Sequence, residues 1–503
     1  MSEYNQILYP THAFPETHPD TLARTAVLFG MEPPPVGDCR VLEIGCGDGG
    51  NIIPMGFEIP NGEFVGIDSA IIPIQNAQRL IERSGAKNVS VRALDLMEIG
   101  PDLGMFDYII AHGIYSWVPS IVQERILSIC RDHLAPRGVA FISFNTGPAG
   151  RIRQLTRDMM LFHLQAAGIE DDPVRESREF LQTLADLAGE SGTWKAILRS
   201  EATRLSKRPD NVTFHDELGP GYSPIYFSDF AAAAERKGLQ FLSEANLSDA
   251  IDPLGKPEAV EALERLAKGD VVKYQQYLDF LVFRGFRRTL LCHREIQLER
   301  DQFGERVQTL LVASALVKSS VEPDGGVVFT KRRGSASVTT NNPIVSLALE
   351  RLETNWPRAQ HFSELAAEIA AKVPPTLKRD APLVLAQAVL RLATKKLVDL
   401  RTYQAPLAES IGERPSATSL ARLQAGKATL ITTLLHAQIE ILDAQSRRLL
   451  QLLDGTRNLP DLVSAMLPEL GTSQKATEQH VIMALEAFHS MGLLRDSVYR
   501  GFS

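Results

Sequence analysis

Cysteine is scarce in this chain of 503 residues, and long apolar runs are missing. The four cysteines are scattered, without a C-x-x-C pair or a histidine cluster at metal-ligand spacing, so the sequence predicts neither a disulfide framework nor a metal site. No run of about 18 apolar residues could span a bilayer. The start MSEYNQILYP lacks the basic head and apolar core of a signal peptide. We therefore expect a cytoplasmic protein with no membrane partner.

In the first part of the chain, basic residues are fewer than acidic ones. The formal net charge is −8 overall, −11 over residues 1–300 and +3 over residues 301–503. An acidic surface disfavours a phosphate backbone and favours a basic partner, such as a lysine-bearing polypeptide. The small positive charge of the second part is not the footprint of a nucleic-acid-binding region, so nucleic acid is not the expected partner.

The predicted secondary structure changes in character several times along the chain. From Arg40 to Asn145, apolar strand-like runs alternate with amphipathic helical segments, which predicts a doubly wound α/β sheet. Residues 150–205 read as an inserted set of helices, and the alternation resumes from 226 to about 295. Two sets of amphipathic helices that each lead into a β-rich edge then indicate α+β, winged-helix-like modules. The predicted parts are the α/β core (1–149), the helical insertion (150–210), the end of the sheet (211–298) and two winged-helix-like modules (299–410 and 411–503).

The most informative stretch is VLEIGCGDGGN at 41–51, a buried strand that runs into a glycine-rich turn. Its glycines allow positive φ and let the backbone approach a ligand, although tight turns without a ligand use the same residues. The context favours a ligand, because Asp68 and Asp95 end the next two predicted strands. An acid in the first position can accept hydrogen bonds from a ribose diol, and one in the second from an adenine amine.

The charges around this turn indicate which ligand binds. A dinucleotide pyrophosphate requires a helix amino end free of negative charge. Here Glu43 precedes the first glycine and Asp48 lies inside the turn. Negative charge repels pyrophosphate and suits a cation, and S-adenosylmethionine carries both a sulfonium and an ammonium group. We therefore expect S-adenosylmethionine as the cofactor.

The chain resembles the class I S-adenosylmethionine-dependent methyltransferases in the order and spacing of five motifs: VLEIGCGDGGN, FVGID at 64–68, LD at 94–95, FDYIIAHGIYSWV at 106–118 and LAPRGV at 134–139. It further resembles bacterial methyltransferases with a methyltransferase regulatory domain, through YPTHAFPETHPDTLARTAVLFG at 9–30, SFNTGPAG at 143–150, YFSDFAAAAERKGLQFLSEA at 226–245 and QYLDFLVFRGFRRTLLCH at 276–293. That group includes rickettsial protein-lysine methyltransferases acting on outer-membrane proteins. The resemblance implies a Rossmann-like sheet of seven strands.

The resemblance also implies a position for each part of the cofactor. The methionine and ribose side would lie against Glu43, Gly45, Cys46 and Gly47; the ribose hydroxyls at Asp68, with Ser69 beside it; the adenine at Asp95 and Leu96; and the sulfonium near Ala111 and His112.

Candidate catalytic residues follow the fourth and fifth predicted strands. Methyl transfer is an in-line displacement, so the enzyme mainly positions and desolvates the acceptor, and a lysine amine must be neutral. Tyr115 and Trp117 offer ring faces that could also attract the product ammonium. His112 either accepts a proton or caps a strand end, and Asn145 either orients the acceptor or caps a loop. The motif FHDE at 214–217 could contribute a polar cluster to the acceptor cleft, but a solvated loop is the expected structure.

These features favour a protein-lysine N-methyltransferase. The helical insertion would serve dimerisation, giving a possible homodimer, or substrate grip, and the C-terminal modules would dock the protein substrate. Two alternatives stay open: a small-molecule methyltransferase, and a non-catalytic regulator that senses the cofactor and uses winged helices to bind DNA or protein.

Overall fold

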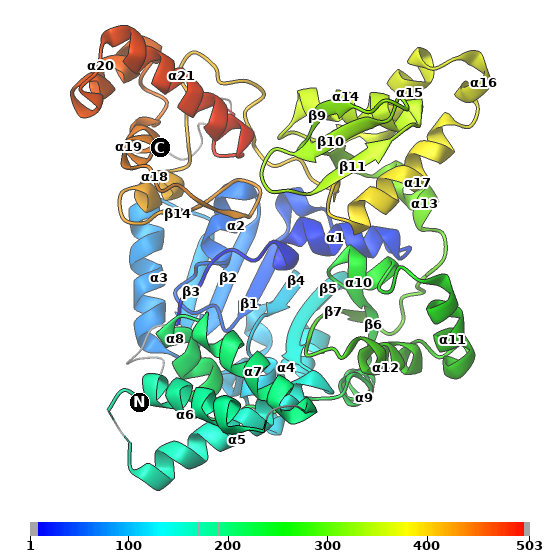
Figure 1. Cartoon of the computed structure of the whole chain (residues 1–503), viewed down its shortest axis with the longest axis vertical. Coiled ribbons are helices and arrows are strands. Elements are labelled where there is room, and N and C mark those ends of the chain that lie inside the picture. Colours follow the sequence, from blue (N-terminus) through cyan, green and yellow to red (C-terminus); the bar gives the residue numbers. More distant parts are fainter. Residues whose placement is uncertain (1–8, 170, 190–191, 497–503) are drawn as a thin grey trace.

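The computed structural model describes residues 9–169, 171–189 and 192–496 (Figure 1). The first eight residues, on which most of the signal-peptide prediction depends, lie outside the described part. Among the described helices, none combines the length and the apolar character that crossing a bilayer requires.

A seven-stranded sheet forms the centre of the molecule, in the order β3-β2-β1-β4-β5-β7-β6. Strands β1 to β5 run parallel, whereas β7 is antiparallel to both of its neighbours. The bounds are β1 (Arg40–Ile44), β2 (Glu63–Asp68), β3 (Val89–Ala93), β4 (Phe106–Ala111), β5 (Leu134–Asn145), β6 (Leu239–Glu244) and β7 (Phe286–His293). The predicted Rossmann-like sheet of seven strands is confirmed.

Helices cover both faces of this sheet, which is why its central strands are apolar almost without interruption. Val41 and Tyr108 share one core with helices α1, α2 and α3, and Leu42 and Ile109 share the other with α4 and α9. The bounds are α1 (Pro19–Leu28), α2 (Ile52–Glu58), α3 (Ile71–Ser84), α4 (Ser120–His133) and α9 (Phe227–Arg236).

The insertion after β5 is helical, as predicted, and has its own small core around Met160, Leu181 and Leu198. It contains α5 (Ala149–Ala167), α6 (Pro173–Leu187), α7 (Thr193–Ser206), α8 (Asp210–Thr213) and a π-helical turn, η7 (Phe214–Leu218). The prediction of a solvated loop at 214–217 is wrong. Glu217 is fully buried there because Arg153 and Arg204 neutralise it, at 2.9 and 2.7 Å.

Three helices connect β6 to β7: α10 (Leu247–Ile251), α11 (Pro257–Ala267) and α12 (Val271–Val282). A buried ion cluster joins α12 to both strands, since Arg287 of β7 contacts Asp279 at 2.8 Å and Glu244 at 2.6 Å.

A second module packs against α1 and shares its core. Its small sheet has the order β12-β8-β13, and a three-stranded sheet of β9, β10 and β11 projects from it. The bounds are α13 (Phe303–Arg306), β8 (Leu311–Ala313), β9 (Leu316–Val321), β10 (Val327–Lys331), β11 (Ser337–Thr340), α14 (Pro343–Asn355), β12 (Gln360–His361), α15 (Phe362–Lys372), α16 (Pro375–Lys378), α17 (Ala381–Thr394) and β13 (Asp399–Arg401). Asp20 of α1 accepts the backbone N–H groups of Thr402 and Tyr403, at 2.6 and 3.0 Å.

The C-terminal module has a separate core, and its β14–β15 hairpin lies over α2 (Figure 1). Ser419 of this module donates its hydroxyl to the Ser84 carbonyl at the end of α3, at 2.5 Å. The bounds are α18 (Ser419–Ala425), β14 (Leu430–Thr432), β15 (Gln438–Glu440), α19 (Ala444–Leu452), α20 (Leu459–Leu470) and α21 (Gln474–Ser490).

Candidate cofactor and acceptor site

The glycine-rich turn between β1 and α2 is held by the acid that ends β2. Gly45 and Gly47 have φ of 75° and 55°, a backbone conformation that glycine adopts without strain. Asp68 accepts the Gly47 N–H through Oδ2 at 2.9 Å and the Ala70 N–H through Oδ1 at 2.8 Å. Burial raises the pKa of Asp68, and the backbone donors oppose the shift. The predicted turn and the predicted ribose acid therefore lie together.

Apolar surface extends from Asp68 toward Asp95. Asp95, just past β3, accepts the Met97 N–H at 2.9 Å and is exposed. Ser69 is exposed and Leu96 is half-buried. Ile71 and Met97 expose 56% and 49% of their surface beside the two acids, although their apolar side chains would normally be covered. This sheet edge combines carboxylates with apolar surface, as a purine-ribose ligand requires.

Glu43 is buried at the end of β1 and accepts a hydrogen bond from Asn51 Nδ2 at 2.7 Å through Oε1. Its other oxygen, Oε2, has no hydrogen-bond partner among the described residues. Burial, with the nearby charge of Asp68, raises the pKa of Glu43 to about 8. A buried carboxylate oxygen without a donor is costly, so this position suits a cationic group. Burial also raises the pKa of the Cys46 thiol, which makes Cys46 unreactive.

The N-terminal segment lies across the glycine-rich turn. Thr11 donates its hydroxyl to the Asp48 carboxylate and accepts the Gly50 N–H at 2.9 Å. The Phe14 ring centroid lies 4.1 Å from that of His112, which directly follows Ala111 at the end of β4. The segment thus connects the turn after β1 with the residue after β4.

His112 forms a hydrogen bond with Ser143 just past the end of β4. Ser143 Oγ accepts the Gly113 N–H at 2.8 Å and lies 3.0 Å from His112 Nδ1. The hydroxyl can donate to Nδ1 or accept from it, so either nitrogen of the ring can carry the hydrogen. Burial lowers the pKa of His112 to about 4. Near neutral pH this side chain is therefore a neutral imidazole.

Tyr115, which was predicted to face the acceptor, lies in the protein interior. It lies in the short helix η6 (Tyr115–Trp117), and its ring packs against Phe230 and Phe144, at centroid distances of 5.3 and 6.1 Å. The ring is buried in the core shared with α4 and α9, because an aromatic side chain is more stable there than in water.

Trp117 and Asn145 meet the helical insertion. The guanidinium groups of Arg153 and Arg157 lie 5.5 and 5.3 Å from the centroid of the Trp117 ring. The chain's own cations therefore lie against the ring that was predicted to attract a product ammonium. Asn145 is buried and accepts from Arg153 Nη1 at 3.2 Å. Both side chains thus contact the insertion.

Three family models match the chain: "Methyltransferase domain" over residues 42–140, "Predicted methyltransferase regulatory domain" over 209–293 and "PKMT, C-terminal winged helix domain" over 413–486. The uncharacterized protein RP028 of Rickettsia prowazekii is 34% identical over 240 residues, which are 48% of this chain and 96% of that protein. RP789 of the same organism is 29% identical over 475 residues, 92% of this chain and 85% of that protein.

A solved structure is similar over the whole length. PKMT2 from Rickettsia typhi in complex with AdoHcy has a TM-score of 0.87 and 26% identity, and the match covers 97% of this chain and 99% of that one. The chain belongs to the class I S-adenosylmethionine-dependent methyltransferases of the rickettsial PKMT type. The predicted family and the predicted C-terminal winged helix are confirmed.

Sequence reasoning missed several residues of this methyltransferase site. Asn51 follows the glycine-rich turn and binds Glu43, and its position at the end of the recognised motif was the available signal. Ser143, which hydrogen-bonds to His112, and Thr11, which contacts the turn, gave no comparable signal. Their roles depend on contacts between segments far apart in sequence.

Proposed function

We propose that this methyltransferase transfers methyl groups from S-adenosylmethionine to lysine side-chain amines of a protein substrate. The observation that carries the proposal is the similarity to PKMT2 over 97% of the chain, which includes the C-terminal winged helix and not only the methyltransferase sheet. The net charge of −11 over residues 1–300 is suited to a basic polypeptide.

Specific residues fit each part of the cofactor. Glu43 Oε2, a buried oxygen without a donor, suits the ammonium group. Asp68 suits the ribose hydroxyls and Asp95 the adenine amine, with Ile71 and Met97 as apolar neighbours. When bound, S-adenosylmethionine supplies a methyl carbon activated by the sulfonium.

On the acceptor side, we assign to the chain the tasks of orienting an amine and excluding water. Phe14, Phe141 and Phe286 surround the neutral His112, with ring centroids at 4.1, 5.7 and 6.3 Å. Apolar surroundings lower the pKa of an amine and so favour its nucleophilic form. The amine's extra proton is lost to solvent before transfer, because its lone pair must be free to attack the methyl carbon.

Incubation with methyl-labelled S-adenosylmethionine and a lysine-rich protein tests the proposal. We expect label in protein, on lysine after hydrolysis, and no transfer to the same protein after acetylation of its lysines, because an amide nitrogen is not nucleophilic. Label only in the organic extract would favour the small-molecule alternative. Cofactor binding without any turnover, together with a gel shift on DNA, would favour the regulator.

A further inference from the structure

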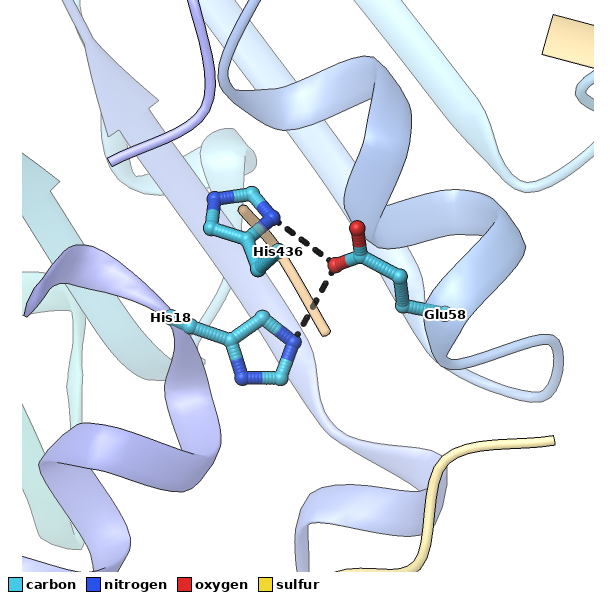
Figure 2. A group of neighbouring side chains, drawn as sticks. All are labelled: His18, Glu58 and His436. Carbon is cyan, nitrogen blue, oxygen red and sulfur yellow. Dashed lines mark hydrogen bonds and ion pairs between the residues drawn. The ribbon is translucent and has the colours of Figure 1, made fainter. Parts of the chain in front are cut away.

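A polar network connects the C-terminal module to the glycine-rich turn. His436, between β14 and β15, lies between Glu58 at the end of α2 and Asn51 at its start. Its Nδ1 is 2.8 Å from Glu58 Oε2, and its Nε2 is 3.0 Å from Asn51 Oδ1. Figure 2 shows His436 and His18 on the same side of Glu58, both directed at one carboxylate oxygen, Oε2. The side chains of His436 and Glu58 are each only 2% exposed.

The orientation of Asn51 in this network is fixed. A backbone N–H can only donate, and that of Phe14 lies 2.9 Å from Asn51 Oδ1, so this atom is the amide oxygen. The amide nitrogen then faces Glu43 Oε1 at 2.7 Å. Because Oδ1 can only accept, His436 Nε2 must carry a hydrogen and donate it to Asn51.

The other side of the His436 ring also requires a proton. Two lone pairs do not approach to 2.8 Å, so one proton lies between His436 Nδ1 and Glu58. Burial raises the pKa of Glu58 and lowers that of His436, and the attraction between the two groups opposes both shifts. Whichever of the two atoms carries this proton, the hydrogen bond fixes the imidazole in the plane needed to reach Asn51.

The same three side chains lie close enough together to suggest a metal site, but their hydrogen bonds argue against one. His18 Nδ1 accepts the Asp20 N–H at 3.2 Å at the start of α1, so the hydrogen of the neutral ring is on Nε2. A metal ion would need a lone pair on that Nε2, which lies 3.3 Å from Glu58. The cluster fits a chain of donors and acceptors better than a set of ligands.

We infer that His436 is a positioning residue for the cofactor: it holds Asn51, and Asn51 holds Glu43 at the glycine-rich turn. The inference rests on the proposed role of this turn in cofactor binding. It gives the C-terminal winged helix a part in building the donor site, in addition to any contact with substrate. The hairpin presents the side chain through a left-handed residue, since His436 has φ of 51°.

Two substitutions of His436 distinguish its hydrogen bond to Asn51 from its hydrogen bond to Glu58. In His436→Gln the side-chain amide NH₂ can replace Nε2–H and keep the donor to Asn51. In His436→Asn the shorter amide can replace Nδ1–H and keep the donor to Glu58, but it cannot reach Asn51. Asparagine tolerates a left-handed backbone better than glutamine, so any loss of stability should be larger for the glutamine variant. The asparagine variant should therefore lose more cofactor affinity, and the glutamine variant more stability.

The measurement is AdoHcy binding by calorimetry to the full chain, with thermal unfolding in parallel. We expect His436→Asn to weaken binding about tenfold and His436→Gln to stay within about threefold of the wild type, as loss of a buried hydrogen-bond partner predicts. Ser419→Ala is the matched control, because it removes a contact between the same module and α3 without touching Asn51. It should bind like the wild type.

Equal binding by His436→Asn and the wild type would overturn the inference. So would equal weakening in all three variants, because that would indicate a general loosening of the module. If the wild type itself failed to bind AdoHcy, the cofactor assignment would be wrong and this inference with it. With a methylatable protein in hand, His436→Asn should raise KM for S-adenosylmethionine and leave kcat within about threefold.

Discussion

Asp68 Oδ2 accepts the Gly47 N–H at 2.9 Å, which ties the end of β2 to the glycine-rich turn after β1. The acid that we assign to the ribose therefore also sets the shape of the turn that would contact the rest of the cofactor. A substitution of Asp68 should therefore affect both ribose binding and the shape of the turn.

Asp68→Ala should lower the affinity for S-adenosylmethionine by at least about 1.5 kcal/mol, because two charge-assisted hydrogen bonds to the ribose are lost. Calorimetry measures the change. Glu82→Ala, which removes an exposed acid on α3, is the control and should bind normally. Unchanged affinity in Asp68→Ala would remove Asp68 from the cofactor site.

Glu43 should make cofactor affinity pH-dependent. With a pKa of about 8, the free carboxyl is mostly neutral at pH 6.5 and mostly charged at pH 9. A cationic ligand binds the charged form better, so affinity should fall as pH is lowered through 8, by at most about tenfold per pH unit. In Glu43→Gln this dependence should disappear in calorimetry over the same range. A wild-type profile as flat as that of the variant would contradict the assignment.

The same shift affects stability. The folded protein holds the Glu43 proton more tightly than the unfolded chain does, so this group's contribution to the free energy of unfolding falls as pH rises from about 4.5 to about 8. As pH approaches 8, the free energy of unfolding measured in urea should therefore fall for the wild type relative to Glu43→Gln.

His112 should not act as the proton acceptor. Its pKa of about 4 makes it a weak base for an amine proton, so His112→Gln should keep at least about a tenth of the wild-type kcat. A general base contributes roughly 100-fold or more. Initial rates at saturating cofactor decide the point, and a loss of that larger size would restore the base assignment.

Arg287 should be essential for stability. Arg287→Met leaves Glu244 buried without its cation and Asp279 with Arg284 alone, at 2.9 Å, which costs about 3–5 kcal/mol. Urea denaturation measures the loss. Arg265→Ala removes an exposed pair on α11 with a 3.9 Å separation and should change the free energy of unfolding by less than about 1 kcal/mol. Similar small losses in both variants would contradict the prediction.

The predicted homodimer can be tested at the helical insertion. Phe162 of α5 and Leu187 of α6 expose 71% and 76% of their surface, an unusual exposure for large apolar side chains. Light scattering should give twice the chain mass for the wild type and a single chain mass for Phe162→Glu. Ile121→Glu, on α4 outside the insertion, should stay dimeric. A monomeric wild type would reject the dimer.

The sheet and the identity of the cofactor could be predicted because the relevant signals are local. Apolar strands report burial directly, and the acid after β2 is found by counting from the glycine-rich turn. The acceptor side could not be predicted in this way. Tyr115 packs against Phe230, which is distant in sequence, and Trp117 meets arginines of the insertion. His436 lies 385 residues beyond Asn51, and no local pattern relates the two.

The bonds from Thr402 and Tyr403 to Asp20 have a consequence for biosynthesis. Because 382 residues separate Asp20 from Thr402, the first helix cannot complete its contacts until most of the polypeptide has left the ribosome. In a nascent or proteolytically shortened chain, α1 would therefore lack these hydrogen bonds. The segment before α1, which lies over the glycine-rich turn, would then reach its native position late in folding.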